Sequence, residues 1–154
     1  MKILACTDGS EHSQKALEAA AAIAEGPNVE EVAIIFVYDH RHDSANPIIF
    51  EGRSYQQIEQ QKETFEKMKE EHKKERKKIL KEALKLFKGK DVKTRSIYKE
   101  GHPSHAITKV AQEEGFDIIV IGSEGLSGLK KIFLGSISNA VLQEAKNCSV
   151  LLVK

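Results

Sequence analysis

The sequence predicts a single-domain α/β fold, an open five-stranded parallel sheet with helices on both faces. Short apolar runs rich in β-branched residues alternate with longer amphipathic stretches in the order β-α-β-α-β-α-β-α-β, which is typical of a sheet built from βαβ units. Two of the apolar runs end directly in glycine turns, as strands do when their carboxyl ends border a ligand crevice. The 154 residues suffice for one domain, and we expect residues 1–154 to form it.

The first part of the chain predicts one βαβ unit. Residues 2–7 form an apolar run that stops at the turn cluster Asp8-Gly9-Ser10, which is typical of a buried strand. Apolar residues then recur at helical spacing from Ser13 until Gly26-Pro27. Residues 31–38 are nearly continuous in their hydrophobicity and suit a strand that is covered on both faces.

A loop and a long charged helix are expected next. Residues 39–54 show no periodicity and predict a loop. Residues 56–87, within a charged segment at about 55–88, lack glycine and proline and predict one helix of about 30 residues, or about 45 Å. Residues 69–78 contain no aliphatic side chain, so we expect them to lie in water. A heptad recurrence of Ile58, Phe65, His72, Ile79 and Leu86 is an alternative sign of a helix contact with another chain.

The last third completes the alternation. Residues 92–98 alternate only weakly, which predicts an edge strand. A helix is expected to begin at Pro103 and to end before Gly115. Residues 117–121 are the most apolar strand, and a final helix and strand follow over residues 137–145 and 148–153.

Composition excludes several classes of protein. Lysine and arginine number 24 against 23 acidic residues, so the charge of +1 gives no basic field for nucleic acid. No apolar run approaches the roughly 18 residues of a membrane span, and the first run is too short for a signal peptide. We therefore expect a cytoplasmic protein with no membrane partner. Cys6 and Cys148 have no metal-finger spacing and are expected to be reduced thiols.

The stretch from Gly122 to Ser136 predicts an anion site, because a glycine-rich loop here joins a buried strand to a helix. At the start of that helix, the amides of Ser136, Ile137 and Ser138 and two hydroxyls are available to a phosphate. An alternative is that Gly122 only permits a tight exit from the strand. Asp8 ends the first strand, and we expect the first and fourth strands to be neighbours in a flavodoxin-like 2-1-3-4-5 or equivalent order.

These motifs resemble the universal stress protein family. The spacing G-x2-G-x9-G-[S/T] is matched by Gly122, Gly125, Gly135 and Ser136, and the strand-end Asp8-Gly9-Ser10 also fits. The resemblance covers essentially the whole chain. It implies an adenine nucleotide alpha hydrolase-like, Rossmann-like fold with sheet order 3-2-1-4-5, membership of the family's ATP-binding group, and a homodimer formed through the last strand, Ser149 to Val153.

The resemblance also implies the role of each site residue. The backbone of Val37 would meet the adenine, and Asp8, with Cys6 and Thr7 beside it, would face the adenosine, with Ile121 near the nucleoside. Gly122 and Ser123 would line the ribose and first phosphate. The other phosphates would meet Gly125, Gly135, Ser136, Ile137 and Ser138.

Binding is favoured over catalysis, because the chain lacks the P-loop lysine. We predict slow ATP hydrolysis or none, with Mg²⁺ or Mn²⁺ accompanying the ATP and Asp8 as an indirect metal contact. The expected function is a nucleotide-binding regulatory dimer in the stress response. The alternatives are a weak ATPase or autophosphorylating phosphotransferase, and a chaperone-like scaffold.

Weaker signals remain beside the glycine loop. Lys130 and Lys131 could reach the phosphates, although solvated loop lysines are commoner. His40 and His42 form a weak metal pattern, and His102 and His105 are surface residues or neighbours of the crevice. Cys6 is either a redox sensor or a small buried apolar residue.

Overall fold

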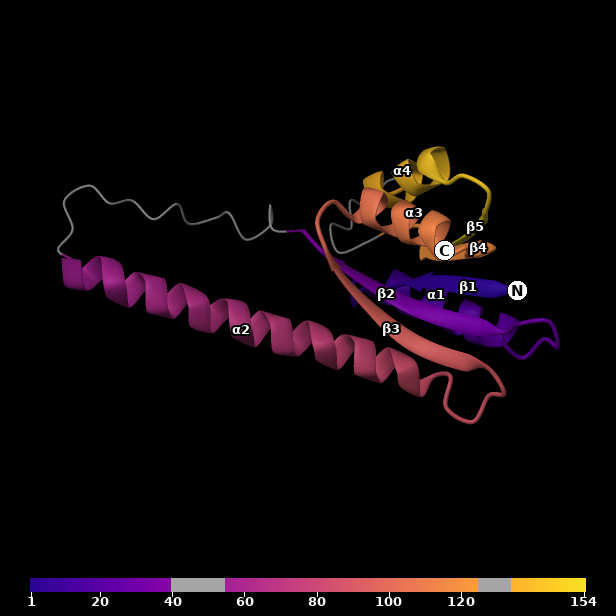
Figure 1. Ribbon diagram of the computed structural model, residues 1–154, viewed down its shortest axis with the longest axis horizontal. Helices are drawn as coiled ribbons and strands as arrows, with labels where there is room; N and C mark the ends of the chain where they lie inside the picture. Colours follow the sequence, from indigo (N-terminus) through magenta and orange to yellow (C-terminus); the bar gives the residue numbers. More distant parts are fainter. Residues whose placement is uncertain (40–54, 125–133) are drawn as a thin grey trace.

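A computed structural model describes residues 1–39, 55–124 and 134–154, and within these ranges it contains five strands and four helices (Figure 1). The elements in chain order are β1 (Lys2–Cys6), α1 (Glu11–Ile23), β2 (Glu31–Tyr38), α2 (Tyr55–Lys85), β3 (Lys93–Glu100), α3 (Pro103–Glu113), β4 (Ile118–Gly122), α4 (Ser136–Glu144) and β5 (Ser149–Val153). The predicted alternation of strands and helices is confirmed. No described helix is long and apolar enough to cross a membrane.

The strands form one parallel sheet in the order β3-β2-β1-β4-β5. The expected neighbourhood of the first and fourth strands is therefore confirmed, and the order that the family resemblance implies is correct. The flavodoxin-like order 2-1-3-4-5 is wrong, and it would itself have separated the first and fourth strands. The second crossover places β3 beyond β2 rather than beside β1. The weakly alternating strand β3 lies at one edge, as predicted, and β5 lies at the other.

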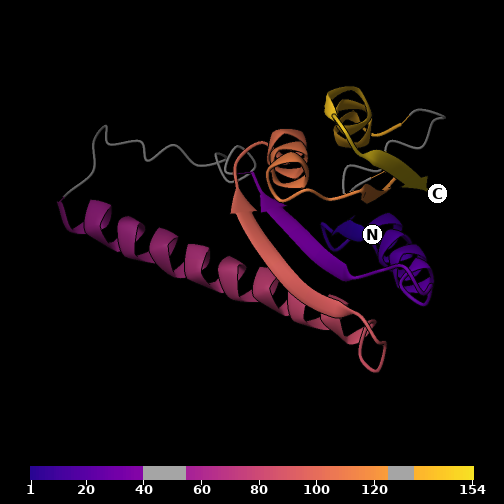
Figure 2. The ribbon, with the colours of Figure 1, turned by 45° about the vertical axis from the view of Figure 1, so that its right-hand side comes forward.

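Helices cover the two faces of the sheet in pairs. On one face, α1 and α2 pack over alternate strand residues that include Ile3, Ala5 and Val120. On the other, α3 and α4 pack over the intervening residues, among them Leu4 and Ile119. Figure 2 shows α2 along β2 and β3, with α3 on the opposite side of the sheet. Because side chains alternate along each strand, they contribute to two separate apolar cores, one on each face of the sheet.

Helix α2 is 31 residues long, and its two halves differ in burial. Leu80 and Ala83 in its last turns, and Phe87 just beyond it, are buried in the core. Every residue from 59 to 71 whose side chain is described is exposed, Met68 included, and this half extends past the sheet (Figure 1). The prediction that residues 69–78 lie in water holds except for His72 and Arg76, which are half-buried.

Candidate functional site

The turn after β1 is held by its own side chains. The Ser10 N–H donates to Asp8 Oδ1 at 2.9 Å, and the Gly9 N–H donates to Thr7 Oγ1 at 3.2 Å. Ser10 then caps α1 by accepting from the Ser13 N–H at 3.2 Å. Gly9 has a φ of +83°, a conformation that favours glycine. The sequence Asp-Gly-Ser therefore builds a compact strand-to-helix turn. It leaves Asp8 half-buried at the carboxyl edge of the sheet, the side where the parallel strands end, as opposed to the amino edge, where they begin.

The backbone of Val37 faces the space beyond the end of β1. The Ile35 carbonyl accepts from the Thr7 N–H at 2.9 Å on the β1 side, and the Tyr38 carbonyl accepts from the Gly101 N–H at 2.8 Å on the β3 side. Successive residues of a parallel strand direct their backbone groups to opposite sides, so Val37 directs its N–H and C=O toward β1. The last β1–β2 pair is Cys6 with Ile35, so β1 has ended where Val37 lies. These backbone groups border the Asp8 turn rather than a neighbouring strand.

Gly122, the last residue of β4, is required by close contact with α1. A Cβ built on Gly122 would lie 2.8 Å from the carbonyl carbon and oxygen of His12. Backbone cannot yield as a flexible side chain can, so any larger residue here would push α1 off the sheet. The close approach of the His12 backbone thus gives a structural reason for glycine at the end of this strand, in line with the alternative interpretation of Gly122.

The base of the glycine-rich loop is closed by hydrogen bonds to one carbonyl. The Ser123 C=O accepts from the Gly135 N–H at 2.8 Å and from the Ser138 hydroxyl at 3.0 Å, while the Ser123 N–H donates to the Val153 C=O at 2.7 Å. Ser123 and Ser138 are both buried. The ends of the loop are therefore tied together, and the Ser138 hydroxyl is engaged in that closure.

The amino terminus of α4 opens toward the same edge. Its N-cap, Gly135, has no side chain to cap the helix, and the first intrahelical bond shown runs from the Asn139 N–H to the Gly135 C=O at 2.9 Å. The amides of Ser136 and Ile137 precede that bond, and both residues are exposed. Such an uncapped first turn attracts anions through its N–H groups and the helix dipole.

Cys6 and Ile121 are buried in the core beneath α3 and α4. Burial, with the nearby Asp8 carboxylate, raises the pKa of the Cys6 thiol far above its ordinary value. A thiol that stays protonated is a poor nucleophile. Cys6 behaves as a small apolar residue of the core rather than as a reactive sensor.

Several predicted residues lie outside the described ranges: Gly125, Lys130, Lys131, His40 and His42. His102 Nδ1 lies 3.0 Å from the Ser104 hydroxyl, and His105 Nδ1 lies 3.7 Å from Glu144 Oε2 across α3 and α4. Within residues 1–39, 55–124 and 134–154, no group of three or more His, Cys, Asp or Glu side chains could hold a metal ion.

Two residues of α2 that the sequence did not single out for the site also reach this edge. Arg76 lies over the ring of Tyr38, with Cζ 3.5 Å from the ring centroid. Ile79 covers Gly9, since a Cβ built there would lie 3.0 Å from Ile79 Cδ1. Their spacing of three residues places them on one helix face, and Ile79 also belongs to the heptad recurrence.

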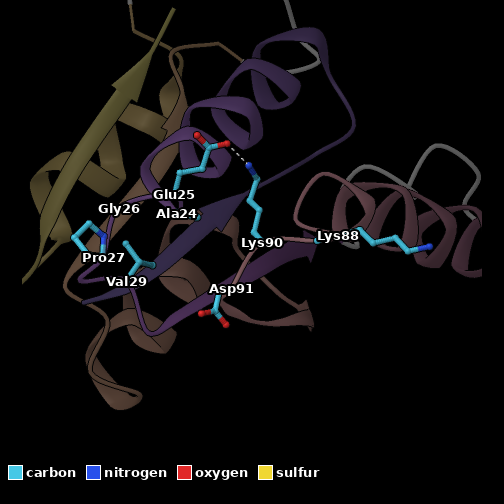
Figure 3. Close-up of a pocket in the computed structure, with 9 residues that line it drawn as sticks. Ala24, Glu25, Gly26, Pro27, Val29, Lys88, Lys90 and Asp91 are labelled. Atoms are coloured by element: carbon cyan, nitrogen blue, oxygen red, sulfur yellow. Dashed lines mark hydrogen bonds and ion pairs between the residues drawn. The ribbon is translucent and has the colours of Figure 1, made fainter.

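Two hollows are lined by residues that the structure describes. One, of about 520 Å³, is at the amino edge of the sheet between the α1–β2 and α2–β3 connections, where Lys90 Nζ bonds Glu25 Oε1 at 2.5 Å (Figure 3). The other, of about 260 Å³, lies between α1 and α2 and is lined by Thr7, Gly9 and Ile79 among others. The first is far from the residues predicted to bind nucleotide, and its paired charges give it no evident ligand.

Comparison with known proteins gives matches over the whole chain. The sequence profile of the Universal stress protein family matches residues 1–154. Universal stress protein YxiE of Bacillus subtilis is 37% identical over 154 residues, 99% of this chain and 98% of the relative. Universal stress protein MJ0577 of Methanocaldococcus jannaschii is 33% identical over 154 residues, 99% of this chain and 94% of the relative.

Solved structures agree with these matches. The structure of MJ0577 has a TM-score of 0.71 at 35% identity and covers 99% of this chain and 94% of its own. Two further structures share the fold at lower identity. A universal stress protein in complex with cAMP is 23% identical, with a TM-score of 0.66, and the match covers 99% of this chain and 95% of that one. A universal stress protein from Archaeoglobus fulgidus in complex with dAMP is 20% identical, with a TM-score of 0.64, and the match covers 100% of this chain and 98% of that one. The sequence match along the full chain and the likeness to the solved structures lead to one conclusion: this protein belongs to the universal stress protein family.

Proposed function

We propose that the protein binds ATP at the carboxyl edge of β1, β2 and β4 and acts as a nucleotide-dependent regulator in the stress response. The observation that carries the proposal is the pair of open backbone groups at this edge. Val37 directs its N–H and C=O past the end of β1, and α4 begins with an uncapped turn on the other side of β1. The first suits the hydrogen-bonding edge of a purine, and the second suits a phosphate.

The residues divide between the two halves of the ligand. Val37 meets the adenine through its backbone, and Asp8 accepts a hydrogen bond from the ribose or base. Cys6, Thr7 and Ile121 shape the nucleoside side from the core. Phosphate contacts come from the amides that follow Gly135, the residues Ser136, Ile137 and Ser138, together with Gly122, Ser123 and Gly125. The hydroxyl of Ser138 holds the loop closed, so its contribution to the ligand is its amide.

Proteins of this fold support an adenine nucleotide as the ligand class, since two were solved with cAMP and dAMP. The spacing of Gly122, Gly125, Gly135 and Ser136 favours the triphosphate, because it resembles the motif of the family's ATP-binding group. We therefore rank ATP above the monophosphates, and competition among the three tests that order.

A divalent cation fits this edge as a companion of the nucleotide. Asp8 supplies one carboxylate, of which Oδ1 accepts the Ser10 N–H. Mg²⁺ commonly uses one or two carboxylates with phosphate oxygens and water, which this donor set can provide. The ion would supply charge neutralisation between the phosphates, and Mn²⁺ would serve equally.

A homodimer through β5 is part of the proposal. Strand Ser149–Val153 lies at the sheet edge, and Val150 and Leu152 direct their backbone groups outward because Ser149 and Val153 bond to the β4 side. Val150→Pro removes an outward N–H and should give monomers in light scattering, whereas Leu151→Pro breaks the ladder with β4 and should unfold the protein. A Val150→Pro protein that remains dimeric would place the interface elsewhere.

Two measurements on purified protein test ATP binding. Nucleotide released by denaturation should be ATP by chromatography. On nucleotide-free protein, ATP at about 100 times its Kd should stabilise the fold by about 2.7 kcal/mol and raise the melting temperature by about 5 to 10 °C. If no nucleotide co-purifies and ATP leaves the melting temperature unchanged, the proposal fails.

Turnover separates regulator from enzyme. Asp8 is the only carboxylate among the predicted site residues and is partly committed to its turn, and no P-loop lysine is present. We expect steady-state hydrolysis with Mg²⁺ or Mn²⁺ well below about 1 per second. A faster rate, or phosphate transfer to the protein itself, would favour the ATPase or phosphotransferase alternative.

A further inference from the structure

The long helix α2 contacts the two strand ends that would hold the adenosine. Arg76 Cζ lies 3.5 Å from the centroid of the Tyr38 ring at the end of β2. Ile79 lies on Gly9 in the turn after β1, so close that a Cβ at Gly9 would come within 3.0 Å of its Cδ1. One face of α2 thus contacts both the end of β2 and the turn after β1.

The contacted residues directly follow the ones assigned to the nucleotide. Tyr38 follows Val37, and Gly9 follows Asp8. Tyr38 is buried on the α1–α2 face of the sheet, while its neighbour Val37 packs on the opposite face. A displacement of the Tyr38 or Gly9 backbone changes the backbone position of Val37 or Asp8, because each pair shares a planar peptide unit.

These contacts stand where α2 leaves the body of the protein. Leu80 and Ala83, further along the helix, are buried in the core. The side chains described between residues 59 and 71 are all exposed. A hollow of about 260 Å³ lies beside Ile79, between α1 and α2. Ile79 therefore has room to move on the side of this hollow, whereas the next residue, Leu80, is buried in the core.

We propose that Arg76 and Ile79 are positioning residues for the adenosine half of the site, and that α2 tightens when the nucleotide binds. The inference rests on the proposed function, since it needs a nucleotide at Asp8 and Val37. Holding Tyr38 and Gly9 in place pre-orders both adenosine contacts, which lowers the entropy lost on binding. By linkage, a nucleotide that orders these residues must stabilise the α2 contacts by the same free energy.

The test separates the adenosine from the phosphates. Ile79→Ala and Arg76→Gln should each weaken ATP and adenosine by about tenfold in calorimetry while leaving inorganic tripolyphosphate within about twofold. Ile79→Val and Arg76→Lys should restore most of the affinity. The matched control is Lys77→Gln, an exposed change on the same turn. All titrations are run below the melting transition, checked by circular dichroism.

Hydrogen exchange of the unaltered protein supplies a readout that needs no variant. ATP should slow exchange in peptides spanning residues 72–85, and tripolyphosphate should not. If wild-type protein binds no ATP, the proposed function itself has failed. If it binds ATP but α2 exchange is unchanged, or if Ile79→Ala and Arg76→Gln match Lys77→Gln in ATP affinity, the positioning role is overturned. Equal losses for ATP and tripolyphosphate would likewise overturn it and indicate a general structural defect.

Discussion

The two edges of the sheet use polar groups in opposite ways. At the amino edge, the charges form closed pairs: Arg95 Nε bonds Glu31 Oε1 at 2.5 Å and its Nη2 bonds Glu114, while Lys90 bonds Glu25. At the carboxyl edge, the Val37 backbone and the first turn of α4 point away from the protein's own ladders. Satisfied groups stabilise a fold, and groups left open offer contacts to a ligand.

The contrast assigns stability to one edge and binding to the other. Glu31 is buried, and Arg95 stands over the ring of Phe116 with Cζ 5.7 Å from its centroid, so the amino edge is a compact charged cluster. The carboxyl edge instead carries the residues Asp8, Val37 and Ser136, which come from three elements far apart in the chain. Variants at one edge should therefore leave the property of the other unchanged.

The largest effect is expected at the carboxyl edge. Gly125→Val should reduce ATP affinity by at least about 100-fold, because a side chain blocks the approach of backbone amides to a phosphate. Its melting temperature without ligand should stay within about 2 °C of wild type. Calorimetry and a thermal scan measure both.

Gly89 offers the matched control at the amino edge. It has a φ of +85° and open space around it, and Gly89→Asn keeps a residue that tolerates this conformation. Its ATP affinity should equal that of wild type. Undiminished affinity in Gly125→Val would show that the phosphates bind elsewhere.

The next effect belongs to the amino edge. Arg95→Met leaves the buried Glu31 carboxylate without its cation and should destabilise the protein by about 2 kcal/mol, less than for a fully buried pair because the Arg95 side chain is 35% exposed. We expect a fall of several degrees in melting temperature and no change in ATP affinity at a temperature where the variant is folded. A weaker ATP affinity in folded Arg95→Met would contradict the assignment of stability to the amino edge and binding to the carboxyl edge.

A smaller effect is expected from pH. The hydrogen bond from Arg95 lowers the pKa of Glu31 below its ordinary value, so between the folded and unfolded pKa values the unfolded state binds more protons. This contribution to stability is complete above the ordinary glutamate pKa and is lost as pH falls through the lowered, folded-state pKa. Melting temperatures from about pH 6 to about pH 3 should fall less steeply in Glu31→Gln than in wild type. Parallel curves would contradict the assignment.

The smallest expected effect concerns the thiols. Cys6 is buried at the carboxyl edge, and Cys148 is half-buried, so peroxide or an alkylating reagent should modify Cys148 first. ATP affinity after treatment should stay within about twofold of the untreated value. Early modification of Cys6, measured by mass spectrometry, would restore its role as a sensor.

The elements were predictable because their signals are local. Apolar runs, the Asp8-Gly9-Ser10 turn and the glycine-free stretch that became α2 each report on a few neighbouring residues. The sheet order came from the family resemblance, since composition left the flavodoxin-like alternative open.

Features that depend on distant contacts were not predictable. The need for glycine at position 122 comes from His12, about 110 residues away in the chain. The direction of the Val37 backbone follows from its register with β1, and Glu31, Arg95 and Glu114 meet only after folding. The same holds for the contact of Arg76 with Tyr38 and of Ile79 with Gly9: residues 69–78 were expected to lie in water, and the heptad that includes Ile79 suggested a contact with another chain.

Amide chemical shifts during an ATP titration test the central claim most directly. On isotopically labelled, nucleotide-free protein with Mg²⁺, the amides of Val37, Ser136 and Ile137 should shift with a common Kd, while those of Glu31, Lys90 and Arg95 should not move. Shifts confined to the amino edge, or no saturable shifts at Val37 and Ser136, would contradict the account.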